Sequence, residues 1–247
     1  MKARAHLGWI PTATLAPVIL LFVSCGRGQP TQSYTPGLGE IERPKRYYAD
    51  GTFTSTGLPE ITIRFDAQLT YVGQTEFTLR GVAEVDRHHL VDADSTGRIK
   101  RLVVLHFEGW LNEQTYNYRI PQELRGADAQ FSSELVRLGE HDYIHNTWFF
   151  DAQRNVAENP EAELARTRKL LEERGYDFPA EIMMSRFVRV VDAERKHEFI
   201  LFYIEPLSRT GFRASDFRRG GAGAEEVERL SAELTARSRE AFIITGG

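Results

Sequence analysis

The sequence predicts an α+β fold, in which two to three helices pack on an antiparallel sheet of about six strands, a meander followed by a later hairpin. Three observations support this. Apolar and polar residues alternate from residue 61 onward, two later segments have the spacing of amphipathic helices, and a pair of apolar strands lies between those helices. Strands grouped ahead of the helices are typical of this fold class.

The first two expected strands cover residues 61–71 and 77–86. Ile61, Ile63 and Phe65 alternate with polar residues in the first, so one face of this strand should be buried. The alternation resumes after Gly73, and we expect a short hairpin between the two strands.

The next two expected strands cover residues 99–110 and 116–120. The first is apolar on both faces, because residues 102–105 are all leucine or valine, and it should therefore be central or covered on both sides. The second is short and alternating. Residues 123–158 are ambiguous, since FSSELVRL is compatible with a helical turn whereas YIHNTWFF is rich in strand formers.

Clear signals return at Asn159, which is a good N-cap and precedes Pro160 at the first helical position. Gly175 ends this expected helix. Residues 182–191 and 197–204 predict two strands around a turn. Residues 225–240 predict a final amphipathic helix.

The N-terminal end has the features of an export signal. Lys2 and Arg4 supply positive charge, and the apolar stretch of residues 15–23 is too short for a membrane span, which needs about 20 apolar residues. Residues 25–58 are rich in Gly, Pro, Thr and Ser and predict a flexible tether. We therefore expect a signal peptide over residues 1–24, this tether, and one globular domain over residues 59–247.

Residues 21–26, LFVSCG, resemble the lipobox of bacterial lipoproteins, with Phe22 in place of the usual leucine. The resemblance implies cleavage before Cys25 and alkylation of its thiol with diacylglycerol, so that acyl chains hold the protein on a membrane. Gly26 implies the outer membrane, facing the periplasm. Cys25 is the chain's single cysteine, so no disulfide can use it. The alternative is an ordinary signal peptide with an incidental cysteine.

The composition excludes several functions. A formal net charge of −4 gives no basic field for nucleic acid. A Walker loop, a dinucleotide fingerprint and the Gly-x-Ser-x-Gly nucleophile motif are all missing from the sequence, and we predict no cofactor.

The first candidate site joins two expected strands. If residues 99–110 and 116–120 form a hairpin, His106 and Glu108 share a face with Asn117 and Arg119, because cross-strand neighbours lie about 5 Å apart. Such a group could perform acid–base chemistry or bind an anion. The alternative is an ordinary solvated sheet face.

The second candidate is a metal site at His141 and His145, which would share one face of a helix. In a strand the two would lie about 13 Å apart, and the surrounding residues favour a strand. Separately, Asp92, Asp94 and Gly97 resemble the start of an EF-hand calcium loop, but the bidentate glutamate is replaced by Val103, and we favour a polar turn.

These observations favour a lipid-anchored envelope protein with a non-enzymatic binding or scaffolding domain. Its partners would be the membrane, through Cys25, and an envelope protein or a small ligand. One alternative is a periplasmic hydrolase using His106 and Glu108 or His141 and His145. A second is a carrier of a lipid-like ligand.

Overall fold

The computed structural model describes residues 46–119, 133–218, 221, 223 and 225–245. It confirms an α+β fold built on antiparallel pairing, but the strands form two sheets, one of seven strands and one of four. The expected signal peptide and Cys25 lie outside the described residues. None of the helices in the described ranges is long and apolar enough to span a bilayer.

The seven-stranded sheet has the order β4-β5-β6-β10-β9-β8-β7. Its strands are β4 (Thr70–Leu79), β5 (Ala83–Ala93), β6 (Ile99–Trp110), β7 (Ser133–Leu138), β8 (His141–Asp151), β9 (Glu181–Val190) and β10 (His197–Pro206). The expected central position of residues 99–110 is confirmed, because β6 pairs with both β5 and β10. The expected later hairpin is confirmed as β9 and β10.

The four-stranded sheet has the order β1-β2-β3-β11. It consists of β1 (Arg46–Ala49), β2 (Thr52–Ser55), β3 (Ile61–Phe65) and β11 (Phe242–Ile244). The tether expected over residues 25–58 is therefore folded from Arg46 onward. The hairpin of β1 and β2 buries Phe53 completely, which explains why a segment with so few aliphatic residues is ordered.

The expected strand over residues 61–71 is wrong, because β3 and β4 belong to different sheets. The chain turns between them at Asp66, whose carboxylate accepts a hydrogen bond from the Gln68 amide at 2.8 Å. The expected hairpin turn near Gly73 is also displaced. Gly73 lies inside β4 at a register shift, and the turn to β5 contains Arg80 and Gly81, both at positive φ.

Three helices cover the larger sheet: α1 (Ala152–Glu158), α2 (Glu163–Glu173) and α3 (Val227–Glu240). Helix α3 confirms the expected last helix. The expected start of the middle helix is wrong: Asn159 caps the C-terminus of α1, where its amide bonds Asn155 O at 3.0 Å. Gly175, at φ 84°, follows the end of α2 as expected.

Two short 3₁₀ turns, η1 (Leu207–Thr210) and η2 (Ala214–Phe217), follow β10. No strand forms over residues 111–119, so the described part of the expected fourth strand is wrong. The acidic segment before β6 is a polar turn, as expected. Asp94 Oδ1 accepts from the Thr96 amide at 2.8 Å and from the Arg98 amide at 3.1 Å.

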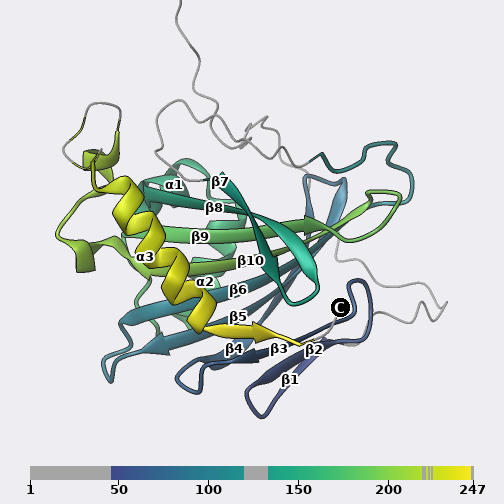
Figure 1. Cartoon of the computed structure of the whole chain (residues 1–247), viewed down its shortest axis with the longest axis horizontal. Coiled ribbons are helices and arrows are strands. Elements are labelled where there is room, and N and C mark those ends of the chain that lie inside the picture. The colour runs from purple at the N-terminus through teal and green to yellow at the C-terminus, as the bar shows by residue number, and fades with distance from the viewer. Residues whose placement is uncertain (1–45, 120–132, 219–220, 222, 224, 246–247) are drawn as a thin grey trace, which may run out of the picture.

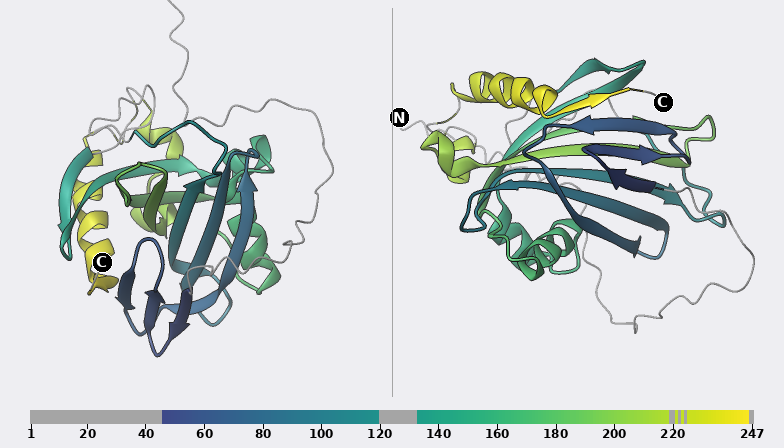
Figure 2. Two further views of the ribbon diagram at one scale, coloured as in Figure 1. Left: turned by 90° about the vertical axis from the view of Figure 1, so that its right-hand side faces the viewer. Right: turned by 90° about the horizontal axis from the view of Figure 1, so that it is seen from below.

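The two faces of the larger sheet carry different layers (Figures 1 and 2). The four-stranded sheet and α3 cover one face, over a core that includes Phe53, Phe187 and Leu234. Helices α1 and α2 cover the other face, over a smaller core that includes Leu171 and Ile182. Both faces of β6 are therefore buried, and its polar residues must find partners inside the protein.

Candidate functional site

Charged side chains gather on the face of the larger sheet that α2 covers. Strand β6 presents apolar residues to this face until it reaches His106 and Glu108. The strand register places Arg87 of β5 opposite His106 and Glu198 of β10 opposite Glu108. Four strands and one helix contribute to this group, which we call the charged cluster: Arg87, His106, Glu108, Glu163, Arg186 and Glu198.

His106 and Glu108 form a hydrogen-bonded pair at the centre of the charged cluster. His106 Nε2 lies 2.9 Å from Glu108 Oε2, and the Tyr118 hydroxyl donates to Glu108 Oε1 at 2.6 Å. Burial acts to raise the pKa of Glu108, but the hydrogen bonds from His106 and Tyr118, together with the neighbouring charges of His106 and Arg186, hold this pKa below its usual value. Glu108 is therefore an oriented carboxylate inside the protein.

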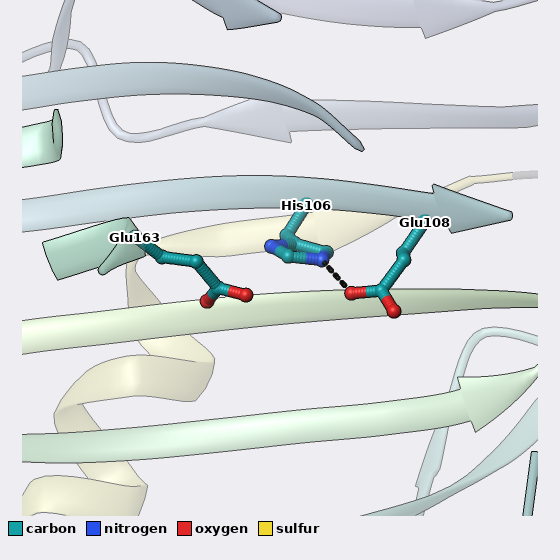
Figure 3. Close-up of side chains that lie close together, drawn as sticks. All are labelled: His106, Glu108 and Glu163. Atoms are coloured by element: carbon teal, nitrogen blue, oxygen red, sulfur yellow. Dashed lines mark hydrogen bonds and ion pairs between the residues drawn. The ribbon is translucent and has the colours of Figure 1, made fainter. Parts of the chain in front are cut away.

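Glu163 faces the same pair from the first residue of α2 (Figure 3). One ligand atom each from His106, Glu108 and Glu163 lie within 4.8 Å of one another. The imidazole of His106 is fully buried, and its Nδ1 has no hydrogen-bond partner among the described residues. Figure 3 shows Nδ1 on the side of the ring toward Glu163.

Two arginines lie beside these carboxylates with hydrogen-bonding capacity to spare. Arg87 Nη1 donates to the backbone oxygen of Glu163 at 2.9 Å, lies 4.0 Å from its carboxylate, and leaves the buried Nε without a partner. Arg186 lies 5.9 Å from the ring centre of Trp148 and makes no hydrogen bond with the described residues. Burial lowers the pKa of Arg186, against the opposing charges of Glu198 and other carboxylates.

Glu198 has the carboxyl group most altered by its surroundings. Burial, followed by the neighbouring charge of Glu108, raises the pKa of Glu198 to about 7. Its side chain forms no hydrogen bond within the described ranges. Groups with shifted pKa values and unused hydrogen-bonding capacity are concentrated at functional sites more often than elsewhere.

The charged cluster can bind a charged ligand or transfer protons. It holds three carboxyl groups, two guanidinium groups and one imidazole. Burial is costly for each of these groups unless it is paired. Nε of Arg87 and Nδ1 of His106 have no hydrogen-bond partner among the described residues, which points to an additional partner in the site.

The structure brings together two of the four residues predicted for the first site. His106 and Glu108 share a face and contact each other, whereas Asn117 and Arg119 are exposed in the loop after β6. The loop is fixed by two bonds of 2.7 Å, from the Tyr118 amide to Arg195 O and from Arg195 Nε to Tyr118 O. These two bonds turn the side chain of Tyr118 toward Glu108. In the expected strand, Asn117 and Arg119 would have faced that side instead.

Sequence reasoning missed Tyr118, Glu163 and three residues on strands. A signal for the strand residues exists: Arg87, Arg186 and Glu198 each lie on a strand face whose other residues are mostly apolar. Nothing in the sequence shows that β5 and β10 flank β6, that β9 lies next to β10, or that the start of α2 covers these strands.

The helix that would place His141 and His145 on one face does not form. Both residues lie in β8, where positions four apart are about 13 Å distant, too far for one ion. His145 is instead buried between Glu134, 3.2 Å from Nδ1, and Ser185, whose Oγ lies 2.6 Å from Nε2.

Ser185, His145 and Glu134 follow the hydrogen-bond order of a catalytic triad. They lie beneath α3, where Ser185 Oγ contacts Ser238 Oγ at 3.4 Å, and both Ser185 and His145 are fully buried. A substrate cannot reach Ser185 in this arrangement. The group is therefore a polar layer that joins α3 to the sheet.

A separate cavity of about 280 Å³ lies outside the charged cluster, lined by residues that include Asp66, Asp92, Arg101, Tyr203, Glu205 and Arg237. Its central arginines are already paired, Arg101 with Asp92 and Arg237 with Glu205, each at 2.9 Å. This polar lining does not resemble the apolar interior expected of a lipid carrier.

Comparison with protein-family models, with curated proteins and with solved structures gives no match for this chain, so the charged cluster is interpreted from its own geometry.

Proposed function

We propose that this chain is a lipid-anchored envelope protein whose folded domain binds a small polar ligand in the charged cluster. The observation that carries the proposal is the unpaired, fully buried Nδ1 of His106 among carboxylates and guanidinium groups that have further hydrogen-bonding capacity. Buried polar groups in folded proteins are nearly always satisfied, so a bound ligand is the expected partner.

The ligand is expected to carry charge. Arg87 and Arg186 suit an anionic group, whereas Glu108 and Glu163 suit a cation or a hydrogen-bond donor. The apolar walls provided by Trp148 and Phe202 limit water and strengthen these interactions.

The envelope location is supported by the sequence. Cys25 follows a short apolar segment and a small residue, and it is the only cysteine. Two or three acyl chains on this residue would anchor the domain stably, whereas one chain would give only marginal binding. The domain would then be held at the membrane by residues 25–45.

Native mass spectrometry of the full chain, purified gently from membranes, tests the binding proposal. We expect the wild-type protein to retain a ligand, and the variant Arg186→Gln to lose it because the ligand loses a charged partner. Arg137→Gln is the matched control, since Arg137 is exposed and paired with Asp142 on the β7–β8 hairpin. A wild-type mass equal to that of the bare lipoprotein, or equal retention by Arg186→Gln, would contradict the proposal.

A hydrolase is the second candidate, and one observation favours it. The hydrogen-bonded series Tyr118, Glu108, His106 orients an imidazole through one nitrogen and leaves the other facing the site, as a general base requires. An enzyme of this kind would lose turnover in Glu108→Gln while its ligand is still retained. Equal hydrolysis of ester and phosphoester substrates by wild type and Glu108→Gln would exclude this mechanism.

A further inference from the structure

We infer that the charged cluster binds one divalent transition-metal ion, with zinc as the best match, between Nδ1 of His106 and the carboxylate of Glu163, while Glu108 orients the imidazole through Nε2. This inference rests on the proposed function, because it adds the ion to the same site; the ligand that Arg186 holds is then an anionic co-ligand of that ion. It requires that two suitable donors converge, that each has a free coordination position, and that the nearby arginines tolerate the ion.

The first requirement concerns geometry. The donor atoms of the three side chains lie within 4.8 Å of one another. Zinc–nitrogen and zinc–oxygen bonds of about 2.0–2.2 Å place tetrahedral ligands roughly 3.4 Å apart. Small rotations of side chains bring the donors to that separation, and Glu163 can make them because it is the most exposed of the three.

The second requirement is met independently by His106. Its ring is fully buried, Nε2 contacts Glu108, and Nδ1 has no partner. Nδ1 lies on the side of the ring toward Glu163, whose carboxylate makes no hydrogen bond with any described residue (Figure 3). A buried ring nitrogen without a partner, beside a carboxylate that accepts no hydrogen bond, is an arrangement that a metal ion completes, and the other ring nitrogen of a metal-bound histidine usually faces a carboxylate, as Nε2 does here.

Glu108 is already held in the orientation that a metal site needs. The Tyr118 hydroxyl donates to Oε1 at 2.6 Å, which leaves Oε2 directed at His106. A carboxylate bonded to the second ring nitrogen fixes the orientation of a ligating histidine and raises its basicity. Tyr118 therefore acts on the ion through Glu108 and is a positioning residue.

The arginines oppose a cation, but the sum of charges leaves room for one. The nearest guanidinium nitrogen, Arg87 Nη1, is 4.0 Å from the Glu163 carboxylate, which is beyond hydrogen-bond distance and leaves both carboxylate oxygens available. Three carboxyl groups and two guanidinium groups surround the imidazole, so acidic groups outnumber the arginines. Arg186 is then available for one anionic co-ligand, such as hydroxide or an oxyanion.

The donor set selects among metals. One imidazole nitrogen and the carboxylate of Glu163 suit zinc and the neighbouring transition ions, whereas magnesium and calcium prefer oxygen alone. We therefore expect zinc to bind much more tightly than magnesium.

Isothermal titration calorimetry of the full chain in detergent, after removal of metal with a chelator, tests the inference with Zn²⁺ alone. We expect one equivalent of Zn²⁺ to bind. The variant Glu163→Gln should weaken binding by roughly 100-fold or more, since even outer-shell changes typically cost about 10–100-fold. Glu173→Gln makes the same charge change at the other end of α2 and should bind as the wild type does.

A second variant tests whether the Tyr118 hydroxyl positions Glu108 or only stabilises the fold. Tyr118→Phe keeps the ring and removes the hydroxyl, so it should weaken Zn²⁺ binding by about 10–100-fold while the cooperative thermal transition persists. The exposed Tyr116 offers the matched control Tyr116→Phe.

Absence of Zn²⁺ binding by the wild type, or equal binding by Glu163→Gln, would overturn the metal inference. Retention of a small organic molecule that requires Arg186, without metal binding, would overturn this inference and leave the proposed function intact. A wild-type protein that binds neither Zn²⁺ nor a small organic molecule would overturn both the metal inference and the proposed function.

Discussion

His89 is a fully buried residue of β5 that contacts α2, and it therefore links the sheet to the helix. Its Nε2 contacts Thr167 Oγ1 at 3.2 Å, and its Nδ1 lies 3.4 Å from Gly73 O. Burial, followed by the charge of Arg87, lowers the pKa of His89 to about 3. The ring is therefore neutral in the folded protein at every pH above that value.

This shift predicts a loss of stability in acid. An unfolded histidine binds a proton near pH 6.5, so between about pH 6.5 and about pH 3 the unfolded state holds more protons than the folded state. The free energy of unfolding should fall as the pH falls through this window, by up to about 1.4 kcal/mol per pH unit from His89. Urea denaturation of wild type and His89→Gln at several pH values measures that contribution.

His145 contributes in the same direction, because burial lowers its pKa to about 4. The variant His89→Gln should therefore reduce the pH dependence without abolishing it. An identical slope in His89→Gln and wild type would show that His89 does not remain neutral in the fold.

Individual residues of the charged cluster were only partly predictable. His106 and Glu108 share a face because strand periodicity requires it, and this holds in the structure. Tyr118 was missed because its inward direction is set by tertiary hydrogen bonds to Arg195, not by alternation. Side-chain direction in loops has no local periodicity that a sequence can reveal.

At the scale of elements, the β5–β6 turn holds the end of α2 in place. Gly97, at φ 86°, accepts a hydrogen bond from the Asp177 amide at 2.8 Å, and a Cβ at Gly97 would lie 2.4 Å from Gly175 O. This contact fixes the far end of the helix whose first residue is Glu163, so the turn helps to set the position of α2 over the charged cluster.

Gly97→Ala should therefore destabilise the protein strongly. A positive φ costs an alanine about 1–2 kcal/mol, and the steric overlap with Gly175 adds about 1–3 kcal/mol. Gly81→Ala is the matched control, because Gly81 also has positive φ, at 72°, but has no atom within 4 Å of its Cβ position. Urea denaturation should give a larger loss for Gly97→Ala, and equal losses would contradict the close packing.

Elements with a strong apolar–polar periodicity were predictable from the sequence, and elements with a weak periodicity were not. The hairpin of β9 and β10 and the helix α3 were expected in nearly their observed positions. The single strand expected over residues 61–71 is in fact parts of two strands, because the apolar–polar alternation of β3 continues through the turn at Asp66. Asn159 was assigned to the wrong helix end, since asparagine is common at both.

At the scale of the whole molecule, the arrangement of two sheets could not be read from the sequence. The pairing of β6 with β10 and of β3 with β11 joins segments that are far apart along the chain. Such pairings depend on complementary buried faces and not on local signals. The position of the charged cluster, which needs β5, β6, β9 and β10 side by side, was hidden for the same reason.

The proposed anchor gives a prediction for the complete protein. Cys25→Ser removes the thiol that would carry the acyl chains, so the protein should move from the membrane fraction to the soluble fraction of the envelope. Fractionation followed by mass measurement of the N-terminal peptide checks this. Ser24→Ala keeps a small residue before the cysteine and should remain membrane-bound. A Cys25→Ser protein that stays in the membrane fraction would argue against the lipid anchor.

The pairing of β11 with β3 has a consequence for biosynthesis. Strand β3 is made early, but its neighbour on one side consists of residues 242–244, so that edge remains open while the intervening chain is synthesised. Late closure of long-range pairs slows folding. A nascent chain delayed in this way stays unfolded longer, with an unpaired strand edge exposed until the last residues are made.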